Sequence, residues 1–171
     1  PPQGIDLASN DYLNLSADPR VVAGFVDGAR REGCGSTGSR LLRGQRESFD
    51  AVERRFARFK QAERAVLFGS GYLANIGVLA TLPEAGDVIL SDERNHASLI
   101  DGMRLSRART VVFPHNDIDA VRQSLASHPG DGIRFVVVES LFSMDGDMAP
   151  VAEYASLCRS AGAVLIVDEA H

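Results

Sequence analysis

The chain has 171 residues, of which 44% are hydrophobic and 24% charged, the usual proportions of a globular domain with a buried core. Its formal net charge is −5 and it has no basic run, which argues against nucleic acid and anionic membranes as partners. It has no apolar run of about 18 residues, so the sequence predicts no membrane span. Cys34 and Cys158 lie far apart without CxxC spacing, and we interpret them as reduced thiols of a cytoplasmic protein.

The first forty residues predict one helix between two irregular stretches. Residues 5–8 alternate like a short strand, and Asn10–Asp11 is typical of a turn. Asp18–Pro19 is a typical helix start, and we predict a helix over residues 19–32. The stretch 33–40 is too rich in glycine for a regular element. It is either a plain loop or a backbone cradle for a ligand.

Residues 47–61 predict a strongly amphipathic helix. Its apolar residues recur at spacings of three and four, at Phe49, Val52, Phe56 and Phe59. Lys60 is the only lysine among the 18 basic residues of the chain. It falls on or near the polar face of this helix, and we interpret it as a solvated side chain.

A glycine turn joins the next predicted strand, 65–68, to a helix that we expect to end at about residue 82. Backbone N–H groups are unpaired at a helix N-terminus, and the helix dipole favours an anion there. Ser70, Gly71 and Tyr72 are therefore candidates for a phosphate site. The same turn is equally typical of a tight connection in which glycine serves packing alone.

Two further predicted strands, 87–91 and 110–113, end in polar segments. His96 follows the first strand and precedes a helix, and His115 follows the second strand and precedes another helix. A histidine in such a place is more often a helix cap or a surface group than a catalytic residue. Both interpretations stay open for His96, and we interpret His115 as a capping or loop residue.

The last two predicted strands are 133–138 and 164–167, with a helix over about 150–161 between them. The final strand is apolar enough to be buried on both faces. The alternation of strands and helices predicts an α/β fold, a doubly wound and mostly parallel sheet in three αβα layers.

Four predicted strand ends carry polar side chains, namely those at Ser70–Tyr72, His96, Ser143 and Asp168 with His171. In a doubly wound sheet, ligands bind at the carboxyl ends of the strands, so these side chains can converge. Together they indicate an anion at the glycine turn, an aromatic ring near His96 and a cationic nitrogen facing Asp168.

Two nucleotide-binding classes do not fit. Asp-Glu-Ala-His after an apolar strand also occurs in nucleic-acid helicases, but these require a P-loop lysine, and Lys60 lies inside an amphipathic helix. The segment Gly33–Gly38 matches G-x-G-x-x-G by its letters. A helix precedes it instead of a strand, so the sequence predicts no dinucleotide site.

As an ordered set, the motifs resemble the α-oxoamine synthases, which are pyridoxal phosphate (PLP) enzymes of fold type I. The matching stretches cover nearly the whole chain and are Ser9–Leu13, Gly35–Arg40, Ser70–Asn75, Asn95–Ser98, His115–Asp117, Phe142–Asp147 and Val167–His171. The resemblance implies that residues 1–40 form an N-terminal segment with a glycine-rich interface loop. Residues 41–171 would form the PLP-binding large domain, incomplete at its C-terminal end.

The resemblance also implies roles for particular residues toward PLP. Ser70–Tyr72 would bind the phosphate, and His96 would stack on the pyridine ring. Asp168 would pair with the protonated ring nitrogen, which keeps the ring able to accept electrons. His171 and Ser143 would hold the 3-oxygen of the ring. His96, Asp168 and His171 are the catalytic candidates of this set, and no metal is implied.

The implied reaction is the decarboxylative condensation of an amino acid with an acyl thioester, in a homodimer with its active site at the subunit interface. L-Alanine and a pimeloyl thioester are the favoured substrates, and glycine or serine with another acyl-CoA is the alternative. Asn10 and His96 would lie near the amino acid. The family's cofactor lysine is not in this sequence, so we expect a segment of a longer protein. A PLP-binding scaffold without catalysis is the alternative outside enzymes.

Overall fold

The structure, a computed structural model, describes residues 4, 7–128 and 132–171. It divides into two units, Pro1–Leu67 and Phe68–His171. The strand predicted over residues 5–8 begins outside the described residues. The predicted division after residue 40 concerns the domains of the whole protein and stays a prediction.

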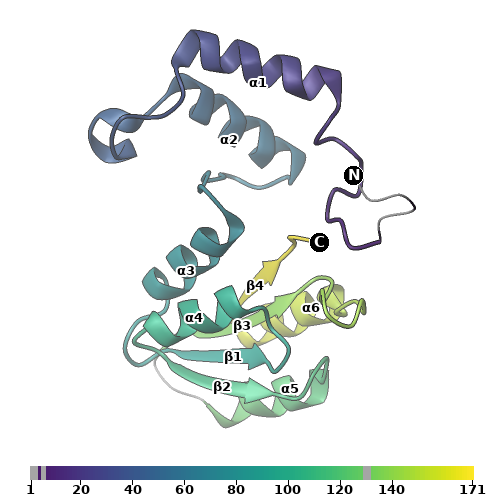
Figure 1. The fold of residues 1–171 in the computed structure, drawn as a ribbon. Helices are drawn as coiled ribbons and strands as arrows, with labels where there is room; N and C mark the ends of the chain where they lie inside the picture. Colours follow the sequence, from purple (N-terminus) through teal and green to yellow (C-terminus); the bar gives the residue numbers. More distant parts are fainter. Residues whose placement is uncertain (1–3, 5–6, 129–131) are drawn as a thin grey trace. The chain divides into compact units, whose positions relative to one another are not determined.

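The first unit contains helix α1 (Pro19–Glu32), a π-helical turn (Arg40–Gly44) and helix α2 (Glu47–Phe59), as Figure 1 shows. Both α-helices were predicted within two residues of their ends. The Asp18 carboxylate accepts the N–H of Arg20 at 2.8 Å and so caps α1. The glycine-rich stretch before the π-helical turn has no regular structure, as predicted.

The predicted apolar face of α2 is present in the sequence but is not covered in this unit. Val52, Phe56 and Phe59 are all exposed. Helix α1 has no buried residue, and Ala57 is the buried residue of α2. Hydrophobic periodicity thus predicted the helix correctly, whereas the burial of its apolar face depends on a second surface.

The second unit is an α/β layer structure in which strands and helices alternate. Its elements are α3 (Gly71–Thr81), β1 (Val88–Asp92), α4 (Ala97–Leu105), β2 (Arg109–Phe113), α5 (Ile118–Ser127), β3 (Arg134–Glu139), α6 (Val151–Ala161) and β4 (Val164–Asp168). The described strands form one parallel sheet in the order β2-β1-β3-β4. The predicted α/β fold with a parallel sheet is confirmed.

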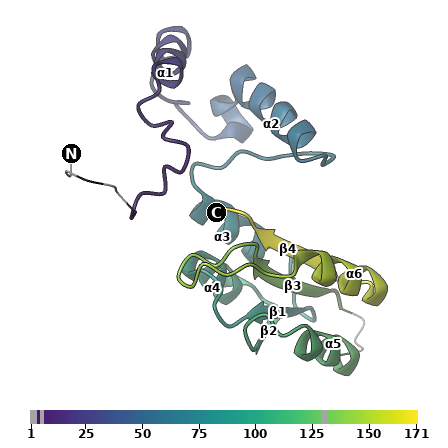
Figure 2. The same cartoon turned by 90° about the vertical axis from the view of Figure 1, so that its right-hand side faces the viewer.

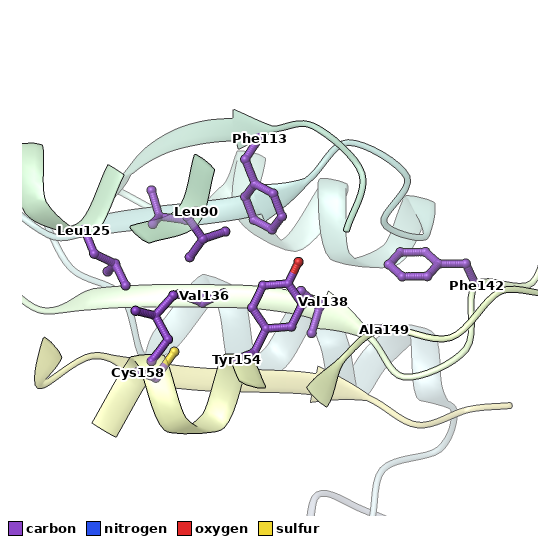
Figure 3. Packing of buried hydrophobic residues seen from close by; sticks show 11 residues of the cluster. Leu90, Phe113, Leu125, Val136, Val138, Phe142, Ala149, Tyr154 and Cys158 are labelled. Atoms are coloured by element: carbon purple, nitrogen blue, oxygen red, sulfur yellow. The ribbon is translucent and has the colours of Figure 1, made fainter. Parts of the chain in front are cut away.

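Alternating side chains of the strands supply the two sides of the core. Ile89 and Phe135 pack with Leu79 of α3 and Leu99 of α4, whereas Leu90 and its neighbours on that face pack with α5 and α6. Figure 2 shows the sheet between these two helix pairs, and Figure 3 shows the second cluster from close by. Both faces of the sheet are therefore covered by helices, which gives the predicted three layers.

The predicted strand at 65–68 is wrong: these residues have no strand partner among the described residues. The N–H of Leu67 donates to the Glu53 carboxylate at 2.7 Å, and its carbonyl accepts from Arg40 at 3.2 Å. Side chains of the same unit thus satisfy the backbone groups that a sheet would otherwise use.

The last strand is present, but the prediction that it is buried on both faces is wrong for this structure. β4 pairs with β3 and is the edge of the sheet, so its residues are half-buried and Val164 is exposed. Among the described residues, no helix is long and apolar enough to cross a membrane.

Candidate functional site

Three strands of the second unit end in carboxylates at the carboxyl-terminal edge of the sheet, which is the side where its parallel strands end. β1 ends at Asp92, β3 at Glu139 and β4 at Asp168, and Glu139 is paired in register with Asp168. Parallel strands place their carboxyl ends together, so these acids share an edge with the polar loops that follow them. This carboxyl-terminal edge is the candidate functional site. It consists of a helix N-terminus, a helix cap and a network of carboxylates.

The N-terminus of α3 supplies donors without acceptors. The Ser70 side chain caps the helix by accepting the N–H of Leu73 at 3.2 Å. In the described part of the chain, no acceptor is recorded for the N–H groups of Gly71 and Tyr72. A Cβ placed on Gly71 would meet nothing within 4 Å, so the backbone is open there. Free N–H groups at a helix N-terminus are the donor set that binds phosphate.

His96 is the N-cap of α4, which is the structural role that sequence analysis weighed for it. Its Nδ1 accepts the N–H of Ser98 at 3.2 Å. The Asn95 side chain anchors this turn by donating to Ser91 at 3.0 Å and to the Val137 carbonyl at 2.8 Å. The cap therefore fixes the backbone on two strands and leaves the imidazole exposed at the sheet edge.

Tyr72 lies beside His96, with the ring centroids 6.4 Å apart and the planes at 83°. Its hydroxyl donates to the Asp101 carboxylate, and this bond raises the pKa of Tyr72 and lowers the pKa of Asp101. Asp101 also accepts from Arg104 at 3.1 Å. The α3 N-terminus is thus joined to α4 through side chains that sequence analysis did not connect.

Asn75 holds Asp168. Its Nδ2 donates to the Asp168 carboxylate at 2.7 Å and to the Ser98 hydroxyl at 2.9 Å. The other Asp168 oxygen accepts the N–H of Ala170 at 2.8 Å. The donors described for Asp168, the Asn75 amide and the Ala170 N–H, are both neutral, so they orient the carboxylate without neutralising its charge. A carboxylate in this state suits a cationic nitrogen of a ligand.

Glu139 is a buried carboxylate next to this network. It accepts the backbone N–H of His96. Burial raises the pKa of Glu139 above its ordinary value, the charge of Asp168 adds to the effect, and the N–H of His96 opposes it. One carboxylate thus positions the His96 turn, while the adjacent one is held by Asn75 and the N–H of Ala170.

The remaining predicted site residues are exposed. Ser143 is exposed in the turn after β3, and His171 is exposed at the end of the described chain. Asn10 is exposed in the first unit. The structure brings Ser70, Gly71, Tyr72, His96 and Asp168 to one edge of the second unit, and the roles assigned to all of these residues stay predictions.

Three features of this edge were not predicted from the sequence: the role of Asn75, the role of Glu139, and the pairing of His115 with Asp92 and Asp147. Glu139 had a signal, because it is the first charge after a buried apolar strand. Asn75 lies four residues after Gly71 on the same helix, which places it one turn inward. The partners of His115 come from segments 23 and 32 residues away, a distance that local patterns do not report.

The model of the family described as "Aminotransferase class I and II" matches residues 2–171, so the chain belongs to that family. Its relatives are α-oxoamine synthases, as the motifs predicted. It is 52% identical to the 8-amino-7-oxononanoate synthase of Mycolicibacterium vanbaalenii, over 100% of this chain and 45% of that protein. It is 48% identical to that of Geobacter sulfurreducens, over 96% of this chain and 42% of that protein. The chain thus spans less than half the length of these curated relatives.

Solved structures agree on the fold. A serine palmitoyltransferase of Sphingomonas wittichii superposes with a TM-score of 0.89 at 37% identity, over 92% of this chain and 40% of that one. The 8-amino-7-oxononanoate synthase of Francisella tularensis superposes with a TM-score of 0.78 at 31% identity, over 96% and 44%. A variant serine palmitoyltransferase from S. paucimobilis, with a TM-score of 0.88 at 34% identity over 92% and 41%, was solved with bound PLP. The fold is that of the fold type I PLP enzymes.

Proposed function

We propose that this chain is the cofactor-binding part of an 8-amino-7-oxononanoate synthase. Such an enzyme condenses L-alanine with a pimeloyl thioester, carried by CoA or an acyl carrier protein, releases CO₂ and serves biotin synthesis. The observation that carries the proposal is the Asp168 carboxylate, which Asn75 orients at the same sheet edge as the open α3 N-terminus. The relatives at about half identity support the choice of substrates.

The residues of the second unit fit PLP as cofactor. The N–H groups of Gly71 and Tyr72, with the Ser70 turn, provide donors for its phosphate. The Asp168 carboxylate provides the acceptor for a protonated pyridine nitrogen. When bound, PLP supplies the electron sink that stabilises a carbanion next to the amino group. His96 at the α4 cap offers the flat face of an imidazole, and Ser143 and His171 offer donors for the ring oxygen.

The chain's own part in the reaction is electrostatic and positional. Asp168 holds a proton on its partner nitrogen because its charge is not neutralised by another side chain among the described residues. Asn75 keeps that carboxylate in one orientation and ties it to Ser98 in the α4 cap. Glu139 accepts the backbone N–H of His96. The residue is thus attached to β3 through its backbone and not through its ring nitrogens.

The lysine that carries the cofactor belongs, in this proposal, to the part of the protein outside this chain. Lys60 is the only lysine here and lies at the C-cap of α2 in the first unit. The arginine that binds the substrate carboxylate belongs there too. The proposal further includes a cytoplasmic homodimer, supported by the exposed apolar side chains of the first unit, with Asn10 near the amino acid.

A serine palmitoyltransferase is the second candidate, because those structures superpose with the higher TM-scores. Glycine C-acetyltransferase and 5-aminolevulinate synthase are the remaining enzymes of this group to compare, and a PLP-binding scaffold is the alternative without catalysis. The curated relatives at 52% and 48% identity, both named 8-amino-7-oxononanoate synthase, favour the biotin enzyme.

The test is substrate-dependent release of thiol and CO₂ by the full-length protein loaded with PLP. We expect release with pimeloyl-CoA and L-alanine, and little with glycine or serine. Release with serine and palmitoyl-CoA instead would assign the second candidate, and PLP binding without any release would assign the scaffold.

The matched variants are Asp168→Asn and Asp119→Asn. Asp168→Asn keeps the shape and an acceptor for Asn75 but removes the charge, so we expect a rate loss of about 10²–10³-fold. Asp119 is exposed on α5 and paired only with Arg122 of its own helix in the described contacts, so its variant should match the wild type. Equal activity of the two variants would refute the role of Asp168.

A further inference from the structure

A histidine is held between two carboxylates at the sheet edge, next to the proposed cofactor residues. His115 lies in the loop between β2 and α5. Its Nδ1 is 2.9 Å from an Asp92 oxygen, and its Nε2 is 2.7 Å from an Asp147 oxygen. From the sequence, His115 was predicted to be a capping or loop residue. It is in a loop, but Asp117 provides the helix cap, and both ring nitrogens of His115 are bonded elsewhere.

This geometry favours the cationic form of the ring, although Nε2 also lies 3.3 Å from the Asn116 side-chain amide. A neutral imidazole has one N–H and one lone pair, so one of the two carboxylates would face a lone pair. Burial lowers the pKa of His115, but the hydrogen bonds and charges of Asp92 and Asp147 outweigh it, so that pKa is raised. The same contact lowers the pKa of Asp147. The two carboxylates therefore favour the imidazolium form of His115 over the neutral ring.

The contacts of His115 reach the loop after β3. The imidazole packs against the ring of Phe142 in a T-shaped arrangement, with centroids 4.5 Å apart and the planes at 88°. Next to it, Asn116 donates its backbone N–H to Asp92 at 2.9 Å and its side-chain amide to Asp147 at 2.9 Å. Asp92 is buried at the end of β1. His115 and Asn116 thus join a fixed strand end to both ends of the loop Phe142–Asp147.

The loop Phe142–Asp147 carries Ser143. Inside it, the N–H of Gly146 donates to the Phe142 carbonyl at 2.8 Å, and the N–H of Phe142 donates to the Asp147 carbonyl at 3.0 Å. Gly146 has φ +74, a conformation that favours glycine. The loop therefore closes on itself into one small body, and its attachment to the sheet decides where Ser143 lies.

We propose that His115 is a positioning residue: as an imidazolium bridging Asp92 and Asp147, it sets the place of the Ser143 loop at the cofactor edge. The proposal rests on the proposed function only for the role of Ser143 toward PLP. The bridge itself is a property of this chain and is tested without cofactor.

Other charged and titratable groups also face the His115 bridge and the loop Phe142–Asp147. Glu93 accepts the backbone N–H of His115 at 3.2 Å. Burial and the charges of Asp92 and Asp117 raise the pKa of the Tyr154 hydroxyl. Arg94 pairs with Asp145 at 2.7 Å and is the cation that faces the loop from the β1 side.

The direction of the pH dependence follows from the raised pKa of His115. The contribution of the bridge to stability is complete below the unfolded pKa of about 6.5. It is lost as pH rises through the higher folded pKa. The loop should therefore loosen at alkaline pH.

The first experiment is NMR of the histidine rings in the full-length wild type, with and without PLP. We expect both nitrogens of His115 to be protonated at neutral pH. Asp147→Asn should lower the pKa of His115 and speed amide exchange at Phe142 and Gly146, whereas the control Asp119→Asn should change neither. A neutral His115 ring in the wild type, or unchanged exchange in Asp147→Asn, overturns the proposal whether or not the protein is a synthase.

The second experiment measures PLP affinity in His115→Gln, Ser143→Ala and the double variant. Loss of the charged hydrogen bonds should weaken binding by about tenfold in His115→Gln. If the bridge acts through Ser143, the double variant should lose little more than the worse single variant. The control His128→Gln at the C-cap of α5 should bind as the wild type does.

Additive losses in the double variant, or wild-type affinity in His115→Gln, overturn the positioning role. Should His115→Gln fail to fold, the wild-type ring state and the Asp147→Asn exchange rates decide the question. Absence of PLP binding by the wild type contradicts the proposed function instead, and the bridge is then judged from the ring state and amide exchange alone.

Discussion

The two units of this chain are built from equally regular helices but bury their apolar residues differently. In the second unit, Leu79 and Leu99 are fully buried between helix and sheet. In the first unit, α1 has no buried residue, and Phe25 and Phe59 are each 78% exposed. The difference shows that a helix packed on a sheet buries its apolar face within its own unit. Helices with the same apolar spacing but without a sheet leave that face for another surface.

The largest expected effect is the difference in unfolding free energy between a leucine-to-alanine substitution in the second unit and one in the first. Leu99→Ala should lower the free energy of unfolding by about 2–5 kcal/mol, because Leu99 is fully buried in the α3–α4 cluster. Leu41→Ala in the first unit should change it by less than about 0.5 kcal/mol within the chain, because Leu41 is 92% exposed. Urea unfolding of the full-length protein measures both.

The same pair of variants also tests the proposed homodimer. The cost of Leu99→Ala should not depend on protein concentration, since its neighbours belong to the same chain. A cost of Leu41→Ala that grows with protein concentration would indicate that a second copy covers the first unit. A loss below about 1 kcal/mol for Leu99→Ala would contradict the comparison itself.

Glycine-to-alanine exchanges should have opposite signs in the two units. A Cβ on Gly102 of α4 would lie 2.9 Å from the Asn75 carbonyl and 2.9 Å from the Leu79 Cβ, so we expect a loss of about 1–3 kcal/mol. A Cβ on Gly24 of α1 meets nothing within 4 Å, and helix propensity predicts a gain of about 0.5–1 kcal/mol. Thermal unfolding gives both values. Two changes of equal sign would contradict the packing difference.

Gly102 also affects the candidate site, because α3 and α4 bring Asn75 and Ser98 together. If Gly102→Ala moves the helices apart, the bond from Asn75 to Ser98 lengthens. PLP affinity should then fall along with stability, whereas Gly24→Ala should leave PLP affinity unchanged.

The sequence predicted the helices, the parallel sheet and the family because these depend on local periodicity and on ordered motifs. Asp168 was predicted as a carboxylate at a strand end, and the structure places it there. The support of that carboxylate by Asn75 was not predicted, because the two residues are 93 positions apart. His115 was assigned from its neighbours in sequence alone, and its carboxylate partners come from the end of β1 and from the loop after β3.

The failed strand prediction has a more specific cause. Residues 65–68 are apolar and precede a glycine turn, which is a correct local signal for a strand. In the structure, the N–H of Leu67 donates to Glu53 of α2, and the carbonyl of Leu67 accepts from Arg40 of the π-helical turn. A local pattern reports the preference of a segment for extended backbone. It does not report whether the pairing partner is a strand or a side chain.

The smallest expected effect is a change in the pKa of Glu53, which tests its pairing with Arg40 and with the N–H of Leu67. Glu53 accepts from Arg40 at 2.6 Å and from the N–H of Leu67 at 2.7 Å, and the Arg40 bond is the main cause that lowers the pKa of Glu53 to about 2. A depressed carboxylate pKa stabilises the fold above the unfolded value of about 4.3, and this stability is lost as pH falls from there toward about 2. Glu53 should therefore remain ionised to about pH 2 in an NMR titration.

Arg40→Gln should return the pKa of Glu53 toward its ordinary value and speed amide exchange at Leu67, because the carboxylate loses its cation and the carbonyl loses a donor. Arg43→Gln is the matched control, since Arg43 is exposed in the same π-helical turn. Glu53 titrating at its ordinary pKa in the wild type would mean that Arg40 does not hold it. The backbone of residues 65–68 would then be left for a strand partner, as the sequence pattern predicted.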